Sequence, residues 1–222
     1  MEKLCLKKMQ PMVCHRYTEE EFVWLLEMIQ KDIPKVEGVY IVDSFGSMKP
    51  EDIEEKIALA DSVLDPQISI GLHSHNSMNL AFENAKTFLE MELNRDIMID
   101  GTLYGMGKGA GNLLTEEIAR YLNQTMGKTY DVSYLKKAVS TYIMPFRREQ
   151  RWGYCKEYYL SAKYQVTPSY AKAFLQEYKK NIEEVEELIK QIPDDKKDSF
   201  DREVAKKLVK SYEDGKNGFI GC

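Results

Sequence analysis

Two histidines, two residues apart, are the residues whose types and spacing most clearly suggest chemistry. They lie in the stretch Ile68-Ser-Ile-Gly-Leu-His-Ser-His-Asn76, which is apolar before His73 as a β-strand would be. Side chains alternate faces along a strand, so His73 and His75 point the same way. Because neutral imidazole is a common ligand of zinc, manganese and iron, the pair predicts part of a metal site. On spacing alone, the alternative is two strand-end residues hydrogen-bonded to the backbone.

Two further polar side chains follow apolar runs. Asp43 ends the run that begins at Gly38, and it is expected either to orient substrate or a ligand near the site, or to cap the next turn. Asn76 follows the histidine pair directly. It is expected either to orient a histidine through its second nitrogen, or to cap the following helix.

A glycine-rich stretch, Gly105-Met-Gly-Lys-Gly-Ala-Gly-Asn112, predicts a loop that either forms a lid or contacts the substrate carboxylate. It is not a nucleotide phosphate loop, because Asn112 stands where a lysine and serine or threonine pair would be needed. Backbone N–H groups with a lysine suit an anionic substrate. The predicted substrate contacts are Gly107, Lys108 and Gly109 in the loop, and Gln10 on the first predicted strand.

The elements that must position these residues alternate between strands and helices. The predicted strands are Leu4–Val13, Gly38–Asp43, Ile68–Asn76 and Asp96–Thr102. The predicted helices are Glu19–Lys31, one opening at Pro50, one ending at Met91, and Thr115–Met126. Such alternation, at a spacing of roughly 30 residues, predicts an α/β fold with a parallel sheet. The polar candidates then share the carboxyl ends of the strands, where such folds hold their active sites.

The pattern changes near residue 128. Five helices are expected beyond it, at Val132–Glu149, Cys155–Tyr164, Ser169–Lys180, Ile182–Ile192 and Phe200–Tyr212. We therefore predict two parts, an α/β domain at 1–127 and a helical region at 128–222.

Composition excludes some partners. The net charge of -5, with no basic stripe, argues against nucleic acid. No apolar run is long enough for a membrane span, and the first residues lack the apolar region of a signal peptide. We expect a cytoplasmic protein.

Three motifs together resemble a known group of enzymes. They are Val42-Asp-Ser-Phe-Gly-Ser-Met48, Gly71-Leu-His-Ser-His-Asn76 and Asp100-Gly-Thr-Leu-Tyr-Gly-Met-Gly-Lys-Gly-Ala-Gly-Asn112. Their order and spacing resemble the pyruvate-aldolase and acyl-CoA lyase superfamily, which is HMGL-like. The nearest subgroup is the 4-hydroxy-2-oxovalerate aldolases. The resemblance covers 1 to about 127 firmly, and the helical region more loosely.

The resemblance implies a (β/α)8 TIM barrel that holds one divalent metal, manganese or else magnesium, zinc or cobalt. The implied ligands are His73, His75 and Asn112, with an aspartate from the first barrel strand. The metal would chelate the carbonyl of a 2-oxo acid or thioester and stabilise the enolate. Tyr154, in a segment similar to one that reaches back toward the site, is the implied acid–base residue, and Asp43 the second catalytic candidate.

The motifs resemble only the last four strands of such a barrel. The fold expected is therefore the C-terminal half of a TIM barrel, followed by a helical region. We expect the sequence to be a fragment of a longer chain. The alternatives are that another polypeptide completes the barrel, or that the half-barrel has acquired a different role. Half a barrel leaves two open sheet edges and an exposed inner face. We expect this face to be apolar and to cause association, and therefore predict a homo-oligomer.

The function implied is C–C bond cleavage or formation in a 2-oxo acid, giving pyruvate and an aldehyde, with the isolated chain inactive. The resemblance also implies an aldehyde dehydrogenase partner. One alternative is an acyl-CoA-dependent synthase or lyase of the same superfamily, and the short helical region argues against it. The other is a non-catalytic half-barrel that binds a partner or a small acid.

Overall fold

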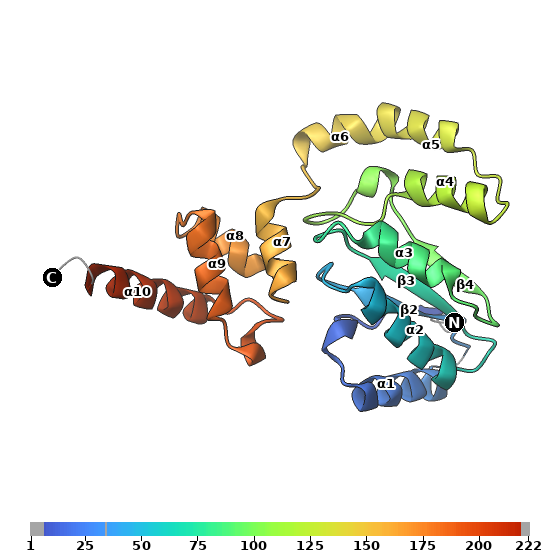
Figure 1. Cartoon of the computed structure of the whole chain (residues 1–222), viewed down its shortest axis with the longest axis horizontal. Helices are drawn as coiled ribbons and strands as arrows, with labels where there is room; N and C mark the ends of the chain where they lie inside the picture. Colours follow the sequence, from blue (N-terminus) through green and yellow to red (C-terminus); the bar gives the residue numbers. More distant parts are fainter. Residues whose placement is uncertain (1–6, 34, 219–222) are drawn as a thin grey trace, which may run out of the picture. The chain divides into compact units, whose positions relative to one another are not determined.

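The computed structural model describes residues 7–33 and 35–218. Its internal contacts divide the chain into two compact units, Met1–Gly153 and Tyr154–Cys222, which are described separately (Figure 1). The first unit is a parallel sheet with helices, and the second is helical. The expected fold class, half of a TIM barrel followed by a helical region, is confirmed. The predicted boundary between the two domains, near residue 127, lies where the strand–helix alternation ends. The division of the chain into domains at that position stays a prediction.

The sheet of the first unit has four parallel strands in the order β1-β2-β3-β4. The strands are β1 (Lys8–Met9), β2 (Gly38–Asp43), β3 (Ser69–Ser74) and β4 (Ile97–Asp100). The helices that follow them in turn are α1 (Glu19–Asp32), α2 (Pro50–Val63), α3 (Ala81–Glu90) and α4 (Thr115–Thr125). A 3₁₀ turn, η1 (Cys14–Arg16), precedes α1, and another, η2 (Leu103–Gly105), follows β4.

The first strand is shorter than the sequence predicted. The predicted strand was Leu4–Val13, of which 4–6 lie outside the described residues, and pairing is found at Lys8 and Met9. Pro11 has no N–H to give to a neighbouring strand, and Val13 has a left-handed φ of 52°. Both features end the strand before the turn.

The two faces of the sheet have different roles. Apolar side chains from β2 and β3, among them Val39, Ile41, Ile70 and Leu72, pack with α1, α2 and α3 in one buried core. These helices cover one face of the sheet in Figure 1. The opposite face carries Val42, His73 and Asp100, which stand in register on neighbouring strands.

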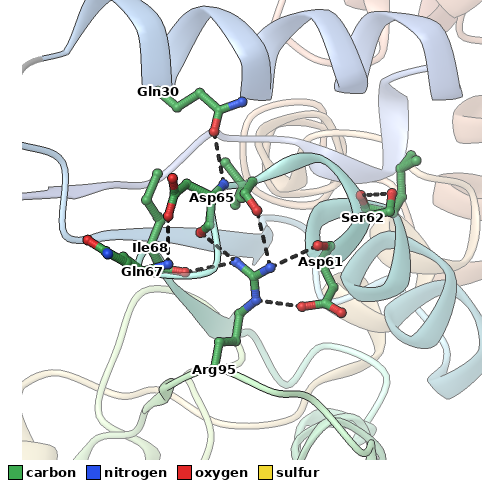
Figure 2. Close-up of polar contacts among 9 residues, drawn as sticks. Gln30, Asp61, Ser62, Asp65, Gln67, Ile68 and Arg95 are labelled. Atoms are coloured by element: carbon green, nitrogen blue, oxygen red, sulfur yellow. Dashed lines mark hydrogen bonds and ion pairs between the residues drawn. The ribbon is translucent and has the colours of Figure 1, made fainter.

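Arg95, in the loop before β4, bonds to the end of α2 and to the loop that leads into β3 (Figure 2). Its guanidinium is nearly buried and donates to the Asp61 carboxylate at 2.5 Å. The remaining N–H groups donate to four backbone carbonyls, those of Asp61, Leu64, Asp65 and Ile68, at 2.8–3.2 Å. All five donors of the arginine are therefore used, at the end of the barrel associated with stability.

One long helical segment follows α4. It consists of α5 (Val132–Ala138), a π-helical stretch η3 (Val139–Ile143) and α6 (Met144–Glu149). The predicted helix Val132–Glu149 is found, and the π turn was not foreseen. Pro145, within the first turn of α6, lacks the N–H that a regular α-helix would use there, so the helix widens just before it.

The second unit has its own core. Its helices are α7 (Lys156–Lys163), α8 (Pro168–Gln176), α9 (Ile182–Lys190) and α10 (Arg202–Gly218), with a 3₁₀ turn η4 (Asp194–Lys196). Leu160, Tyr170, Phe174 and Leu188 are at its centre, each 2 % exposed or less. Within the described ranges, no helix is long and apolar enough to cross a membrane.

Candidate metal and substrate site

His73 is oriented by a carboxylate on the neighbouring strand. Its Nδ1 lies 2.9 Å from Oδ2 of Asp100, which stands directly opposite it in the parallel register. Gln10 donates from Nε2 to the same oxygen at 3.4 Å. A carboxylate accepts only, so this hydrogen bond places a proton on Nδ1 of His73, and in the neutral ring Nε2 then carries the lone pair. Gln10, predicted as a substrate contact, thus lies beside the histidine pair.

His75 is oriented by the main chain. Its Nδ1 lies 2.8 Å from the backbone carbonyl oxygen of Asp43, which also accepts only. Burial lowers the pKa of His75, and the neighbouring His73 lowers it further, against the opposing effect of the Asp43 carbonyl. The two rings lie 5.0 Å apart, centre to centre. In the neutral form of each ring, the proton is therefore held on Nδ1 and the lone pair lies on Nε2, the state in which histidine binds metal.

Asn112 lies next to this pair. It forms an isolated antiparallel bridge with His75, and its Nδ2 donates to the Met106 carbonyl at 3.0 Å. Its Oδ1 is buried and has no hydrogen-bond partner among the described residues. A Cβ at Gly107 would lie only 2.5 Å from that Nδ2, so the amide keeps this position because residue 107 is glycine. An unpaired buried acceptor is costly, which makes a cation an apt partner for it.

These three side chains fit a divalent cation as part of a ligand set. Two imidazole nitrogens and one amide oxygen suit manganese, zinc or cobalt, and leave further positions for other ligands. Within residues 7–33 and 35–218, no cluster of three or more His, Cys, Asp or Glu side chains could hold a metal. The structure brings His73 and His75 together and bridges His75 to Asn112, and the binding of a metal by these residues stays a prediction.

Asp43 makes the contacts of a turn cap. Its side chain is fully buried, and Oδ1 accepts from the backbone N–H groups of Ser47 at 2.9 Å and Met48 at 3.2 Å. It alternates with Val42, so it lies on the helix-covered face, away from His73. Burial raises the pKa of Asp43 to about 7. Its contact with the site is the backbone carbonyl on His75, and a catalytic role for its carboxyl stays a prediction.

Of the two roles expected for Asn76, orienting a histidine or capping the following helix, the structure shows the contact of a helix cap. Its Oδ1 accepts from the backbone N–H of Ala81 at 3.2 Å, at the start of α3. Its own backbone N–H donates to the Gly111 carbonyl at 2.9 Å, which ties the end of β3 to the glycine-rich loop.

The glycine-rich loop is held from two sides. Gly109 and Gly111 have left-handed φ values of 69° and 84°. The segment after α6 packs on it, because Trp152 donates from Nε1 to the Tyr104 carbonyl at 2.9 Å and the Gly153 N–H donates to the Gly109 carbonyl at 3.1 Å. Lys108 is exposed at its tip, with no ion pair in the described part of the chain. The predicted substrate contacts Gly107, Lys108 and Gly109 therefore lie in the same loop as Asn112.

Tyr154, the predicted acid–base residue, is the first residue of the second unit. Its side chain is 56 % exposed, and its ring lies 6.2 Å from that of Tyr159. Its predicted role stays a prediction.

Two residues that the sequence reasoning did not single out belong to the site. Asp100 orients His73, and Trp152 holds the glycine-rich loop. Asp100 could have been found, because it ends the strand after the histidine strand and a parallel register places it level with His73. Nothing in the local sequence indicates the contact of Trp152 with Tyr104, which lies 48 positions away.

The four parallel strands and their helices define half of an α/β barrel. The HMGL-like family model matches residues 8–141, more than half of the chain, and the chain belongs to this family. Its relatives include the 4-hydroxy-2-oxovalerate aldolases of Chloroflexus aurantiacus, 39 % identical over 114 residues, and Thermomicrobium roseum, 37 % identical over 108 residues. The matches cover 49 % and 48 % of this chain, but 32 % and 29 % of those proteins. The chain thus spans about a third of the length of these relatives.

Solved structures show the same fold. The N-terminal domain of a candidate aldolase from Bacteroides vulgatus aligns with a TM-score of 0.65 at 24 % identity, over 76 % of this chain and 53 % of that one. The carboxyl transferase domain of Rhizobium etli pyruvate carboxylase, solved with pyruvate, aligns with a TM-score of 0.66 at 13 % identity, over 96 % of this chain and 38 % of that one.

Proposed function

We propose that this chain carries the metal-binding part of an aldolase site that cleaves or forms a C–C bond in a 2-oxo acid. The substrate class is that of the 4-hydroxy-2-oxovalerate aldolases among its relatives, with pyruvate and an aldehyde as products. The observation that carries the proposal is the histidine pair, whose Nδ1 atoms are both held by acceptors. The unpartnered buried Oδ1 of Asn112, the bridge partner of His75, supports it.

Each described residue has a stated part in this proposal. A divalent cation held by His73, His75 and Asn112 would act as a Lewis acid on the 2-oxo group. Asp100 and the Asp43 carbonyl fix the imidazole tautomers that bind it. Lys108 and the loop N–H groups would attract the substrate carboxylate, because they supply positive charge in the loop that also carries Asn112.

Two parts of the proposal rest on resemblance alone. Tyr154 is proposed as the acid–base residue. A partner aldehyde dehydrogenase is proposed to take up the aldehyde. Because the chain spans about a third of its relatives' length, we also propose that turnover needs the remaining strands of a barrel.

The first experiment measures manganese binding by titration calorimetry. We expect roughly micromolar binding by the chain, and its loss in the double variant His73→Ala/His75→Ala. The chain is acidic and can attract cations unspecifically, so a matched control is needed. Asp194→Ala/Asp195→Ala removes two exposed carboxylates, 88 % and 76 % accessible, from the second unit and should bind as the wild type does.

Variants of Asn112 test whether this residue is a third metal ligand or whether the two histidines bind the metal alone. Asn112→Ala should weaken manganese binding by about tenfold, and Asn112→Asp, which keeps an oxygen and adds charge, should not. Magnesium, zinc and cobalt titrated in the same way rank the metals. Equal manganese binding by the wild type and the histidine double variant would refute the proposal.

Turnover is tested separately from binding. Pyruvate release from 4-hydroxy-2-oxovalerate should be absent for the chain alone, and should appear when it is co-expressed with the first half of an aldolase barrel. Acetyl-CoA with a 2-oxo acid tests the synthase alternative in the same preparation. Metal binding without any turnover in the completed barrel would favour the non-catalytic half-barrel.

A further inference from the structure

Three arginines gather where the long helical segment ends. Arg147, Arg148 and Arg151 line, with Met144, a hollow of about 430 Å³ in the first unit. The three arginines lie within a stretch of five residues, in a chain whose net charge is -5. Arg148 and Arg151 are exposed, and Arg147 is half-buried. A concentration of positive charge in an acidic chain calls for a compensating negative group.

Within residues 7–33 and 35–218, no carboxylate forms an ion pair with these arginines. Arg95 and Arg202 pair with the carboxylates of Asp61 and Glu177. In contrast, none of the three clustered arginines forms an ion pair with another described residue. Glu149 is the one acidic residue in the stretch 147–151, so the stretch carries a net positive charge that an anion from solution would offset.

Arg147 is already held in place. Its guanidinium lies 5.2 Å from the centre of the Tyr104 ring and 5.9 Å from that of Trp152. It donates one recorded hydrogen bond, from Nη2 to the Trp152 carbonyl at 3.3 Å. A cation fixed by two aromatic rings has less conformational entropy to lose when it binds a ligand.

The favourable interaction of positive charge with the carboxyl end of α6 explains only two of the three arginines. Arg147 and Arg148 lie in the last turn of α6, where positive charge is favoured by the helix dipole. Arg151 lies beyond Glu149, the last residue of α6, and lines the same hollow. The third arginine therefore requires another explanation.

We propose that Arg147, Arg148 and Arg151 bind the phosphate group of a small phosphate ester or diphosphate. The planar fork of arginine matches phosphate oxygens, and three positive charges suit a dianion better than a single carboxylate. None of the three arginines is among the proposed metal or substrate contacts, and Arg147 meets that site only through Trp152, which holds the glycine-rich loop.

The test is titration calorimetry of the full chain with inorganic pyrophosphate, and then with orthophosphate, at a constant ionic strength of about 0.15 M. We expect Arg148→Gln/Arg151→Gln to weaken pyrophosphate binding by roughly tenfold or more. Both residues are exposed, so the variant should melt as the wild type does. Arg148→Lys/Arg151→Lys should lie between the two, because it keeps the charge and loses the fork.

The matched control removes the same charge elsewhere on the same helical segment. Lys136 and Lys137 on α5 are exposed, about 17 Å from Arg148 along the segment, or two Debye lengths. Lys136→Gln/Lys137→Gln should therefore change pyrophosphate binding less than twofold. The proposal is overturned if the wild type binds neither anion at millimolar concentration. It is equally overturned if the arginine and lysine variants weaken binding to the same extent.

Discussion

Replacing Asp43 by asparagine should remove a pH-dependent loss of stability from the first unit. Burial raises the pKa of Asp43 from 3.8 to about 7, although the N–H groups of Ser47 and Met48 act in the opposite direction. The folded state thus holds the proton more tightly than the unfolded state. The stabilisation is complete below the unfolded pKa and is lost as the pH rises through about 7. At 1.36 kcal/mol per pKa unit, the loss is about 4 kcal/mol.

The asparagine variant cannot ionise, and its Oδ1 can still accept from Ser47 and Met48. The free energy of unfolding of Asp43→Asn relative to the wild type should therefore increase by up to about 4 kcal/mol between about pH 4 and about pH 8. Subtracting the wild type removes the contributions of other titrating groups. Urea unfolding followed by tryptophan fluorescence measures the right unit, because both tryptophans, Trp24 and Trp152, lie in it.

Glu54→Gln is the control for this measurement. Glu54 is an exposed acid on α2, and its replacement should leave the difference from the wild type independent of pH. The reasoning would be refuted if Asp43→Asn and the wild type kept a constant difference in unfolding free energy across the same range. That result would mean that the carboxylate is ionised in the fold without a cost from burial.

Three further predictions concern the two ends of the sheet. Arg95→Met should lower the free energy of unfolding by about 3–5 kcal/mol in urea titrations, because it leaves Asp61 and four carbonyls without their donor; a loss below about 1 kcal/mol would contradict this. Gly107→Ala should weaken manganese binding about tenfold in calorimetry without lowering the melting temperature of the second unit, because its Cβ would displace the Asn112 amide; unchanged affinity would argue against that amide as a ligand. Because burial lowers the pKa of His75, its ring should titrate below the ordinary histidine value of about 6.5 in the metal-free chain, as followed by NMR; a midpoint at or above that pH would contradict it.

The sequence predicted the architecture well because hydrophobic periodicity is a local property. The strand Gly38–Asp43 and the helix beginning at Pro50 were found at those residues. The first strand was predicted too long, although Pro11 was visible in the sequence as a break. The π turn before Pro145 was not predicted, because the replacement of one missing hydrogen bond depends on how the rest of the helix packs.

The candidate site was predicted in part. The face shared by His73 and His75 follows from strand alternation, but their acceptors do not. The partner of His73 depends on the register between β3 and β4, and the partner of His75 is a backbone carbonyl, which no residue type signals. The contact of Trp152 with Tyr104 spans 48 positions and follows from tertiary packing.

The two histidines differ in whether a mutation can remove the hydrogen-bond acceptor that orients the ring. His73 depends on a carboxylate, and a single codon change at Asp100 removes it. His75 depends on the main-chain oxygen of residue 43, and every amino acid supplies that atom. Genetic drift at position 43 can therefore alter stability while His75 keeps its acceptor, as long as β2 keeps its path. In a lineage losing its original activity, we expect the orientation of His73 to decay before that of His75.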